Sequence, residues 1–135
     1  MPIMTFLPIL VSAIASYLVS ALWYLVVFRA PYIEALGKTT EQLAKGPSGL
    51  QASVLQVIGN LVLAGVLAWL MARLGYTSVQ QGMLLGGLVW LGFVVAVLGP
   101  LYAFEANSPM LLLLNAGSVL LTLLITGAIL GGWRV

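Results

Sequence analysis

Charged residues divide this chain into four long apolar stretches. No Asp, Glu, Lys or Arg occurs within residues 1–28, 46–72, 74–104 or 106–133. A helix needs roughly 20 apolar residues to cross a ~30 Å hydrocarbon core, so each stretch is long enough to span a membrane. Lipid offers no hydrogen bonds to the backbone, which favours helices throughout. The pattern predicts one all-α domain, an up-down antiparallel bundle with membrane spans at about 5–28, 50–73, 79–104 and 109–133.

The link at 30–49 is the longest polar stretch of the chain. It holds Glu34, Lys38, Glu41 and Lys45. Thr39 followed three residues later by Gln42 has the spacing of a capping box, which marks the start of a helix. We expect one or two short interfacial helices here, between the first and second spans. A solvated loop is the alternative.

The third span contains two local signals. Ser78 and Gln81 have the spacing of another capping box, which predicts a helix start at about 79. Gly99-Pro100 interrupts the backbone hydrogen bonds of the same span. Proline lacks the N–H and clashes with the carbonyl four residues before it, so a kink is predicted near Ala96.

Glycines four residues apart occur in the last two spans. Gly82 and Gly86 form one G-x-x-x-G pair, and Gly127 and Gly131 form another. Such pairs allow two helix backbones to approach closely in a membrane, although the motif is common by chance in apolar sequence. The four glycines are candidates for close helix packing.

Four of the hydrogen-bonding side chains inside the spans form the candidate polar cluster. They are Gln56 and Asn60, one turn apart, with Trp90 and Asn115 on the last two spans. Polar groups at this depth are expected to face protein or a water-filled cavity. One interpretation is hydrogen bonding between helices that fixes their packing. The other is a wet pathway for a substrate.

Glu105 is the only ionisable side chain between Arg73 and Arg134. Counting roughly 20 residues of hydrocarbon from about residue 83 places it at the membrane interface, where a carboxylate can stay ionised. In an antiparallel bundle the first and third spans end on the same side of the membrane. We therefore predict an ion pair between Arg29 and Glu105.

Composition supports a membrane protein and narrows its chemistry. Of the 135 residues, 62% are hydrophobic and 6% charged, against about a quarter charged in soluble domains. Cys, His and Asp are absent. This excludes disulfides, Ser–His catalysis and zinc sites built on Cys or His. A net charge of +2 does not indicate nucleic-acid binding. We expect no cofactor, no metal and no enzymatic activity.

The distribution of cations leaves the orientation open. Arg29, Lys38 and Lys45 lie on one predicted side, and Arg73 and Arg134 lie on the other. A difference of one cation slightly favours a cytoplasmic 30–49 link under the positive-inside rule, and dual insertion stays open. The N-terminus lacks the basic region of a signal peptide, so the first apolar stretch is expected to be retained as a span.

Several short motifs resemble a bacterial membrane family catalogued as domain of unknown function seventeen-sixty-one. The motifs follow one another in the order and spacing typical of that family, over nearly the whole chain. They are Ala21-Leu22-Trp23-Tyr24, Trp90-Leu91-Gly92-Phe93, Phe104-Glu105, Asn115-Ala116-Gly117 and Gly127-Ala128-Ile129. The resemblance implies a four-helix protein of the bacterial cytoplasmic membrane, and it implies no activity.

Three functions compete. The first is a structural or interaction bundle, either a homo-oligomer or an accessory subunit of a larger membrane complex, whose partners are lipid and protein. The second is an oligomeric transporter or channel for a small solute, with Gln56, Asn60, Trp90, Glu105 and Asn115 along its pathway. The third is an enzyme, which would have to rely on Glu105, hydroxyl groups or a bound cofactor. The sparse intramembrane charge favours the first.

Overall fold

The computed structural model describes residues 3–133 and shows a helical bundle in this part of the chain. Four helical segments are long and apolar enough to cross a membrane: Phe6–Val27, Gly49–Leu74, Val79–Phe104 and Pro109–Gly132. These segments confirm the predicted all-α membrane fold.

Shorter helical segments make up the spans and their links. α1 (Ile3–Leu22) continues into the π-helix η1 (Trp23–Val27), and α5 (Val79–Val89) continues through the π-helix η2 (Trp90–Val95) into α6 (Ala96–Phe104). The two remaining spans are the single helices α4 (Gly49–Leu74) and α7 (Pro109–Gly132). The polar link forms two short helices, α2 (Arg29–Leu36) and α3 (Thr40–Ala44). Short helices were predicted for this stretch, with a solvated loop as the alternative.

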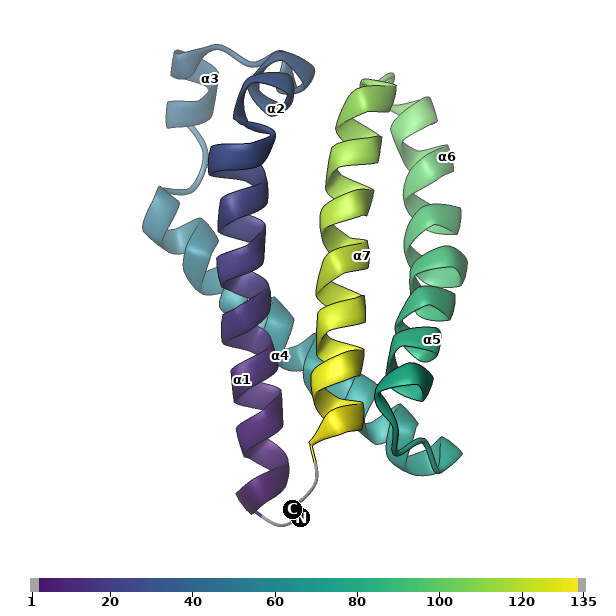
Figure 1. Ribbon diagram of the computed structural model, residues 1–135. Helices are drawn as coiled ribbons and strands as arrows, with labels where there is room; N and C mark the ends of the chain where they lie inside the picture. The colour runs from purple at the N-terminus through teal and green to yellow at the C-terminus, as the bar shows by residue number, and fades with distance from the viewer. Residues whose placement is uncertain (1–2, 134–135) are drawn as a thin grey trace.

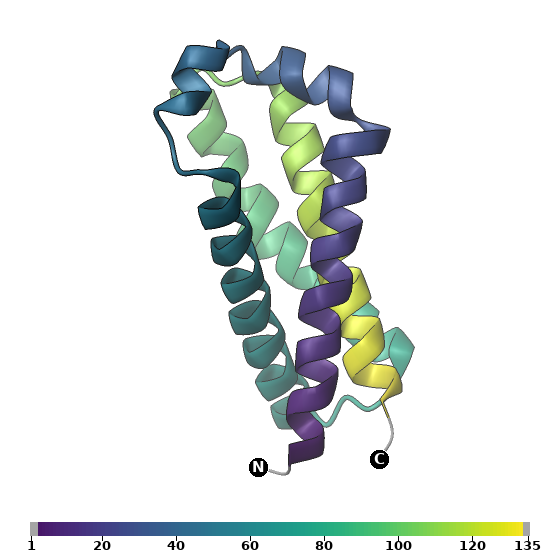
Figure 2. The ribbon, with the colours of Figure 1, turned by 90° about the vertical axis from the view of Figure 1, so that its left-hand side faces the viewer.

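α7 is the central helix of the bundle. It packs against α1 on one side and against α5 on the other, while α4 crosses behind and contacts both α1 and α7 (Figure 1). Turned by 90°, the same helices show α4 beside α1 and the α2–α3 link across one end (Figure 2). Consistent with this order, 39% of the most apolar stretch of α7 is buried, but only 11% of that of the third span.

Polar caps begin the helices. The predicted capping box of Thr39 and Gln42 is confirmed, and Ser48 with Gln51 forms a second one ahead of α4. Ser78 caps α5 by accepting the N–H of Gln81. The predicted box there is only half formed, because the Gln81 amide oxygen reaches back to the N–H of Thr77, one residue further.

The third span is irregular one turn earlier than predicted. The π-helix η2 ends where α6 begins at Ala96, so the wide turn precedes the residue at which the kink was expected. Pro100 lies inside α6, where it removes one backbone N–H and crowds the Ala96 carbonyl. Widening the preceding turn is a common way for a helix to absorb such a disruption.

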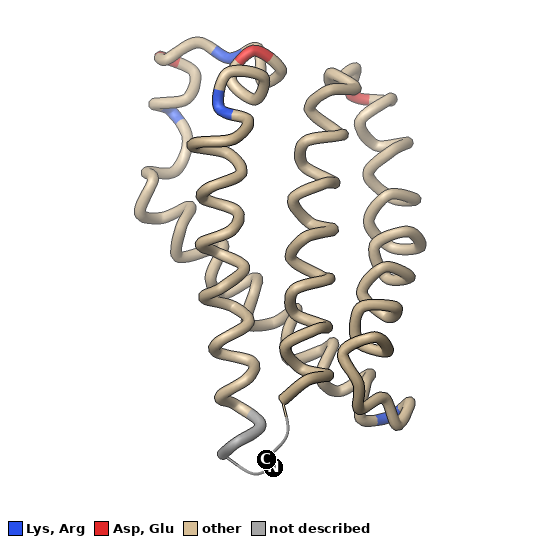
Figure 3. Tube along the Cα trace, viewed as in Figure 1, with Lys and Arg blue, Asp and Glu red and all other residues tan. Residues whose placement is uncertain are grey.

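One cluster of buried apolar side chains lies at the end of the bundle opposite α2. There Leu67 and Met71 of α4 pack with Leu85 of α5, and all three are buried. The charged residues of the described chain lie near the two ends of the spans (Figure 3). Between those ends the spans expose many large apolar side chains.

Candidate functional site

A line of hydroxyl groups joins α1 to α7. Ser16 Oγ lies 3.4 Å from Thr126 Oγ1, and Ser20 Oγ lies 3.4 Å from Ser118 Oγ. Thr122, between the two α7 partners, donates to the Ser118 carbonyl within its own helix. All five side chains are buried. Small hydroxyl residues let two helices approach closely while their polar atoms stay hydrogen-bonded.

Ser12 continues the same face of α1 without a partner. Its side chain is fully buried, and its hydroxyl makes no hydrogen bond within the described part of the chain. An unpaired buried polar group costs about 1–3 kcal/mol. We therefore expect Ser12→Ala to leave the free energy of unfolding unchanged or to raise it. Ser16→Ala leaves the Thr126 hydroxyl without its partner, and it is expected to lower the free energy of unfolding by roughly 0.6 kcal/mol. SDS titration measures the free energy of unfolding of each variant, and equal losses in the two variants would contradict the prediction.

Glycines bring the backbones of α5 and α7 into contact. A Cβ added at Gly82 would collide with the backbone of Gly127, and the reverse is also true. A Cβ at Gly131 would strike the Ser78 carbonyl, and one at Gly86 would lie 2.6 Å from the Leu123 carbonyl oxygen. The four candidate close-packing glycines therefore all lie in one interface, between the third and fourth spans.

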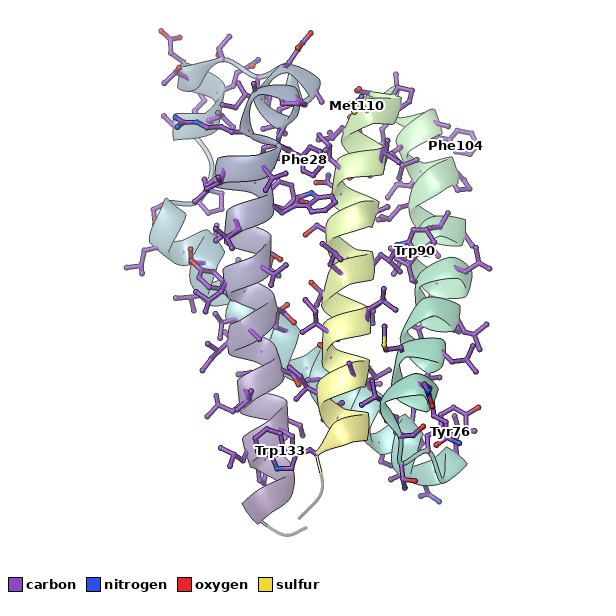
Figure 4. All side chains as sticks on the ribbon, viewed as in Figure 1. Phe28, Tyr76, Trp90, Phe104, Met110 and Trp133 are labelled. Carbon is purple, nitrogen blue, oxygen red and sulfur yellow. The ribbon has the colours of Figure 1, made fainter. Side chains whose placement is uncertain are left out.

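Two tryptophans from neighbouring spans donate hydrogen bonds to the same turn of α7, from opposite sides of the helix. The Trp23 indole donates to the Leu114 carbonyl at 3.0 Å, and the Trp90 indole donates to the Ala116 carbonyl at 2.7 Å. The Trp90 side chain is labelled beside α7 in Figure 4. Each carbonyl has a second lone pair that can accept this additional bond. The acceptor of the Trp90 indole is thus a main-chain carbonyl and not one of the amides of the candidate polar cluster.

Asn115 lies within this turn and connects two tyrosines. The Tyr24 hydroxyl donates to Asn115 Oδ1 at 2.7 Å, and Asn115 Nδ2 donates to the Tyr102 hydroxyl at 2.7 Å. The rings of Tyr24 and Tyr32 pack at a tilt, with centroids 4.5 Å apart and an angle of 59° between their planes. One amide thus joins η1 and α6 to the central helix, with α2 in contact through the tyrosine rings.

Gln56 and Asn60 form a separate contact between α4 and α1. Gln56 Nε2 donates to Asn60 Oδ1 at 3.0 Å, and Asn60 Nδ2 donates to the Ala13 carbonyl at 3.2 Å. Asn60 is buried, whereas Gln56 is exposed on α4. The candidate polar residues Gln56, Asn60, Trp90 and Asn115 therefore fall into three separate hydrogen-bonded sets, rather than one line of polar groups.

Gln56 faces a pocket where α4 diverges from the end of the first span. Its volume is about 430 Å³. We call it the hydroxyl pocket, because its lining contains five hydroxyl groups and one side-chain amide among apolar residues. Its polar residues are Tyr17, Ser20, Tyr24, Tyr32, Ser53 and Gln56, and its apolar residues are Ala21, Leu25 and Ala52.

The hydroxyl pocket is neutral but rich in donors and acceptors. The Tyr17 hydroxyl donates to Ser53 Oγ at 2.9 Å across one wall. Burial raises the pKa of the Tyr32 hydroxyl above its ordinary value, so this group stays a neutral donor and acceptor at physiological pH. No charged side chain is among the residues that line the pocket. Within the described chain, no group of three or more His, Asp or Glu residues could hold a metal ion.

The predicted ion pair of Arg29 and Glu105 is not formed in the described structure, where no salt bridge joins these side chains within 4.0 Å. Glu105 is exposed and accepts a hydrogen bond from Asn107 at 3.2 Å. Both residues do belong to the same end of the bundle. α7 stands between the first span and α6, however, and it separates the ends on which the two charges lie (Figure 1).

The aromatic residues at the end of the first span have a role that the sequence did not reveal. Tryptophan and tyrosine at the end of a span are typical of anchors at the membrane surface, yet Trp23 and Tyr24 both turn inward and bond to α7. Tyr17, Ser20 and Tyr24 recur at intervals of three and four, which places them on one helix face. That spacing is the signal that could have indicated the pocket.

One known protein family matches the chain. The family described as "Protein of unknown function (DUF1761)" matches residues 7–131. The chain belongs to this family. The DUF1761 match extends from the first turns of α1 to the last turn of α7, so it includes the hydroxyl pocket, the Asn115 turn and the glycine contact. No curated protein and no solved structure matches the chain.

Proposed function

We propose that this DUF1761 protein is a non-catalytic interaction bundle that associates with a second copy of itself in the membrane. The third span carries the proposal. It is the least buried of the four spans, although the opposite side of its first half is tightly packed on α7. The uncovered side is therefore the natural surface for a neighbour.

Small residues follow this uncovered side along η2 and α6. Gly92, Ala96, Gly99 and Ala103 recur at spacings of four, three and four, which keeps them on one face of a helix. Gly92, Ala96 and Ala103 are exposed. A Cβ added at Gly92 or Gly99 would meet nothing within 4 Å.

Packing within a single chain does not require glycine at either position. Glycine in a helix costs about 0.5–1 kcal/mol relative to alanine, and here alanine would fit. Close approach by another helix offsets that cost, because small residues let backbones pack in lipid. A two-fold pair of third spans would bring the same surface of each copy together.

Single cysteines test the proposed interface, since the chain has no cysteine of its own. Gly92→Cys and Ala96→Cys are expected to form disulfide-linked dimers in oxidised membranes, because a disulfide requires Cα atoms about 4.4–6.8 Å apart. The matched control is Val62→Cys, a position 60% exposed on α4. Non-reducing gel electrophoresis measures the dimer fraction.

The result distinguishes self-association from the alternatives. Strong cross-linking at Gly92 and Ala96 with little at Val62 supports the dimer. Equal cross-linking at all three positions would indicate random collision and contradict it. A Gly92→Leu variant adds a second check: it is expected to abolish the dimer and preserve the monomer, because its side chain enters open space.

A further inference from the structure

The hydroxyl pocket begins beyond one end of the first span and extends toward the middle of the first two spans. It reaches Tyr32 of α2, beyond the end of the first span at Val27. It extends inward to Tyr17, ten residues before Val27, and to Gln56, seven residues after Gly49. At 1.5 Å per residue these positions lie about 15 Å and about 10 Å inside the ends of their spans.

An apolar groove adjoins the hydroxyl pocket. It has a volume of about 330 Å³ and is lined by Tyr17, Ser53, Val54, Val57 and Ile58. Tyr17 and Ser53 also line the hydroxyl pocket, so their hydrogen bond forms a wall common to both spaces. A space rich in hydroxyl groups and an almost wholly apolar space therefore lie side by side between α1 and α4.

We propose that these two spaces bind one neutral lipid with a hydroxyl-rich headgroup, such as a monoglycosyl diacylglycerol. The headgroup occupies the hydroxyl pocket, and an acyl chain follows the apolar groove. Each volume is within or near the range of about 300–1,000 Å³ typical of ligand sites. The proposal is independent of self-association through the third span, which lies on another side of the bundle.

The chemistry of the lining selects the headgroup. Tyrosine and serine hydroxyls can both donate and accept. The Tyr17 and Tyr24 hydroxyls already donate within the protein and keep their acceptor positions, and the Gln56 amide, which donates once to Asn60, keeps one donor and an acceptor. Sugar hydroxyls can satisfy such a mixed set. A phosphate brings negative charge, and no cation lines the pocket to balance it. Desolvating that charge without a partner is costly, so an anionic headgroup is disfavoured.

Native mass spectrometry of the full chain in neutral detergent tests the assignment. Three probes are added separately at equal concentration: monoglucosyl-dioleoylglycerol, dioleoylphosphatidylglycerol and methyl glucoside. We expect occupancy by the glucosyl lipid at least fivefold above that by the anionic lipid, and no retained methyl glucoside. Equal occupancy by both lipids would overturn the proposal as unselective contact. Methyl glucoside bound as well as the glucosyl lipid would overturn the lipid assignment in favour of a free polyol.

Two matched pairs of variants locate the site. Ala52→Phe fills the hydroxyl pocket and is expected to lower the affinity for the glucosyl lipid at least tenfold, whereas Ala72→Phe makes the same change elsewhere on α4. Gln56→Leu removes one polar group of the pocket and is expected to lower the affinity for the glucosyl lipid several-fold. Its control is Gln80→Leu, at an exposed position. Folding is verified by monodisperse elution. Unchanged affinity in both folded pocket variants would overturn the proposal, as would equal losses in the controls.

Discussion

Replacing Gly127 with alanine is expected to separate α5 from α7 and to unfold the bundle. The added methyl group would overlap the backbone of Gly82, and a backbone cannot rotate away as a side chain can. Overpacking typically costs about 1–3 kcal/mol when side chains can adjust. We expect at least roughly 3 kcal/mol here, at the upper end of that range. Gly82→Ala makes the collision from the other side and is expected to have the same effect.

Gly87→Ala is the matched control for this prediction. Gly87 follows Gly86 directly in α5, but a Cβ there would meet nothing within 4 Å. Alanine is the better helix former by about 1 kcal/mol, so this variant is expected to be neutral or stabilising. SDS titration with circular dichroism gives the free energy of unfolding of each variant. Similar stability in Gly87→Ala and Gly127→Ala would contradict a backbone contact between the two helices.

The sequence predicted the fold well because lipid simplifies the problem. Each span must be apolar, long and internally hydrogen-bonded, so the positions of the charged residues nearly determine the helix boundaries. Local capping signals refined those boundaries, as Thr39 and Gln42 show. Span boundaries and caps depend on residues that are close together in the sequence, so they can be predicted from a single sequence.

Contacts between helices were harder to predict. The glycine spacing indicated close packing but not which helices would meet, since every face of every span is apolar. The same ambiguity affected Trp23 and Tyr24, whose side chains suit either a membrane surface or a buried carbonyl. For Arg29 and Glu105 the predicted side of the membrane was shared, but the order of helices around α7 was unknown.

The pocket could not be predicted from polarity alone. Ser53 and Tyr17 are unremarkable in the sequence and become neighbours only because α4 crosses α1. The divergence of α4 from the end of the first span then opens the space beside them. Crossing geometry depends on the packing of all four spans, which local patterns do not contain.

Asn115→Leu is expected to produce the second large loss of stability. The substitution keeps the branched shape of the side chain but leaves the hydroxyls of Tyr24 and Tyr102 without their amide partner. Leaving a buried polar group unpaired costs about 1–3 kcal/mol, and both tyrosines are only partly buried, so we expect roughly 2 kcal/mol. The matched control is Asn107→Leu, an exposed amide at the α6–α7 bend, which is expected to cost under about 0.5 kcal/mol.

A double-mutant cycle decides whether the Asn115 bonds hold the bundle together. If Asn115 stabilises the structure through Tyr24, the pair Tyr24→Phe and Asn115→Leu costs less than the sum of the single changes, because the second change removes a group already left unpaired. Strictly additive costs would show that the two side chains act separately. Full stability of Asn115→Leu would contradict the structural role, and would return Asn115 to consideration as part of a solute pathway.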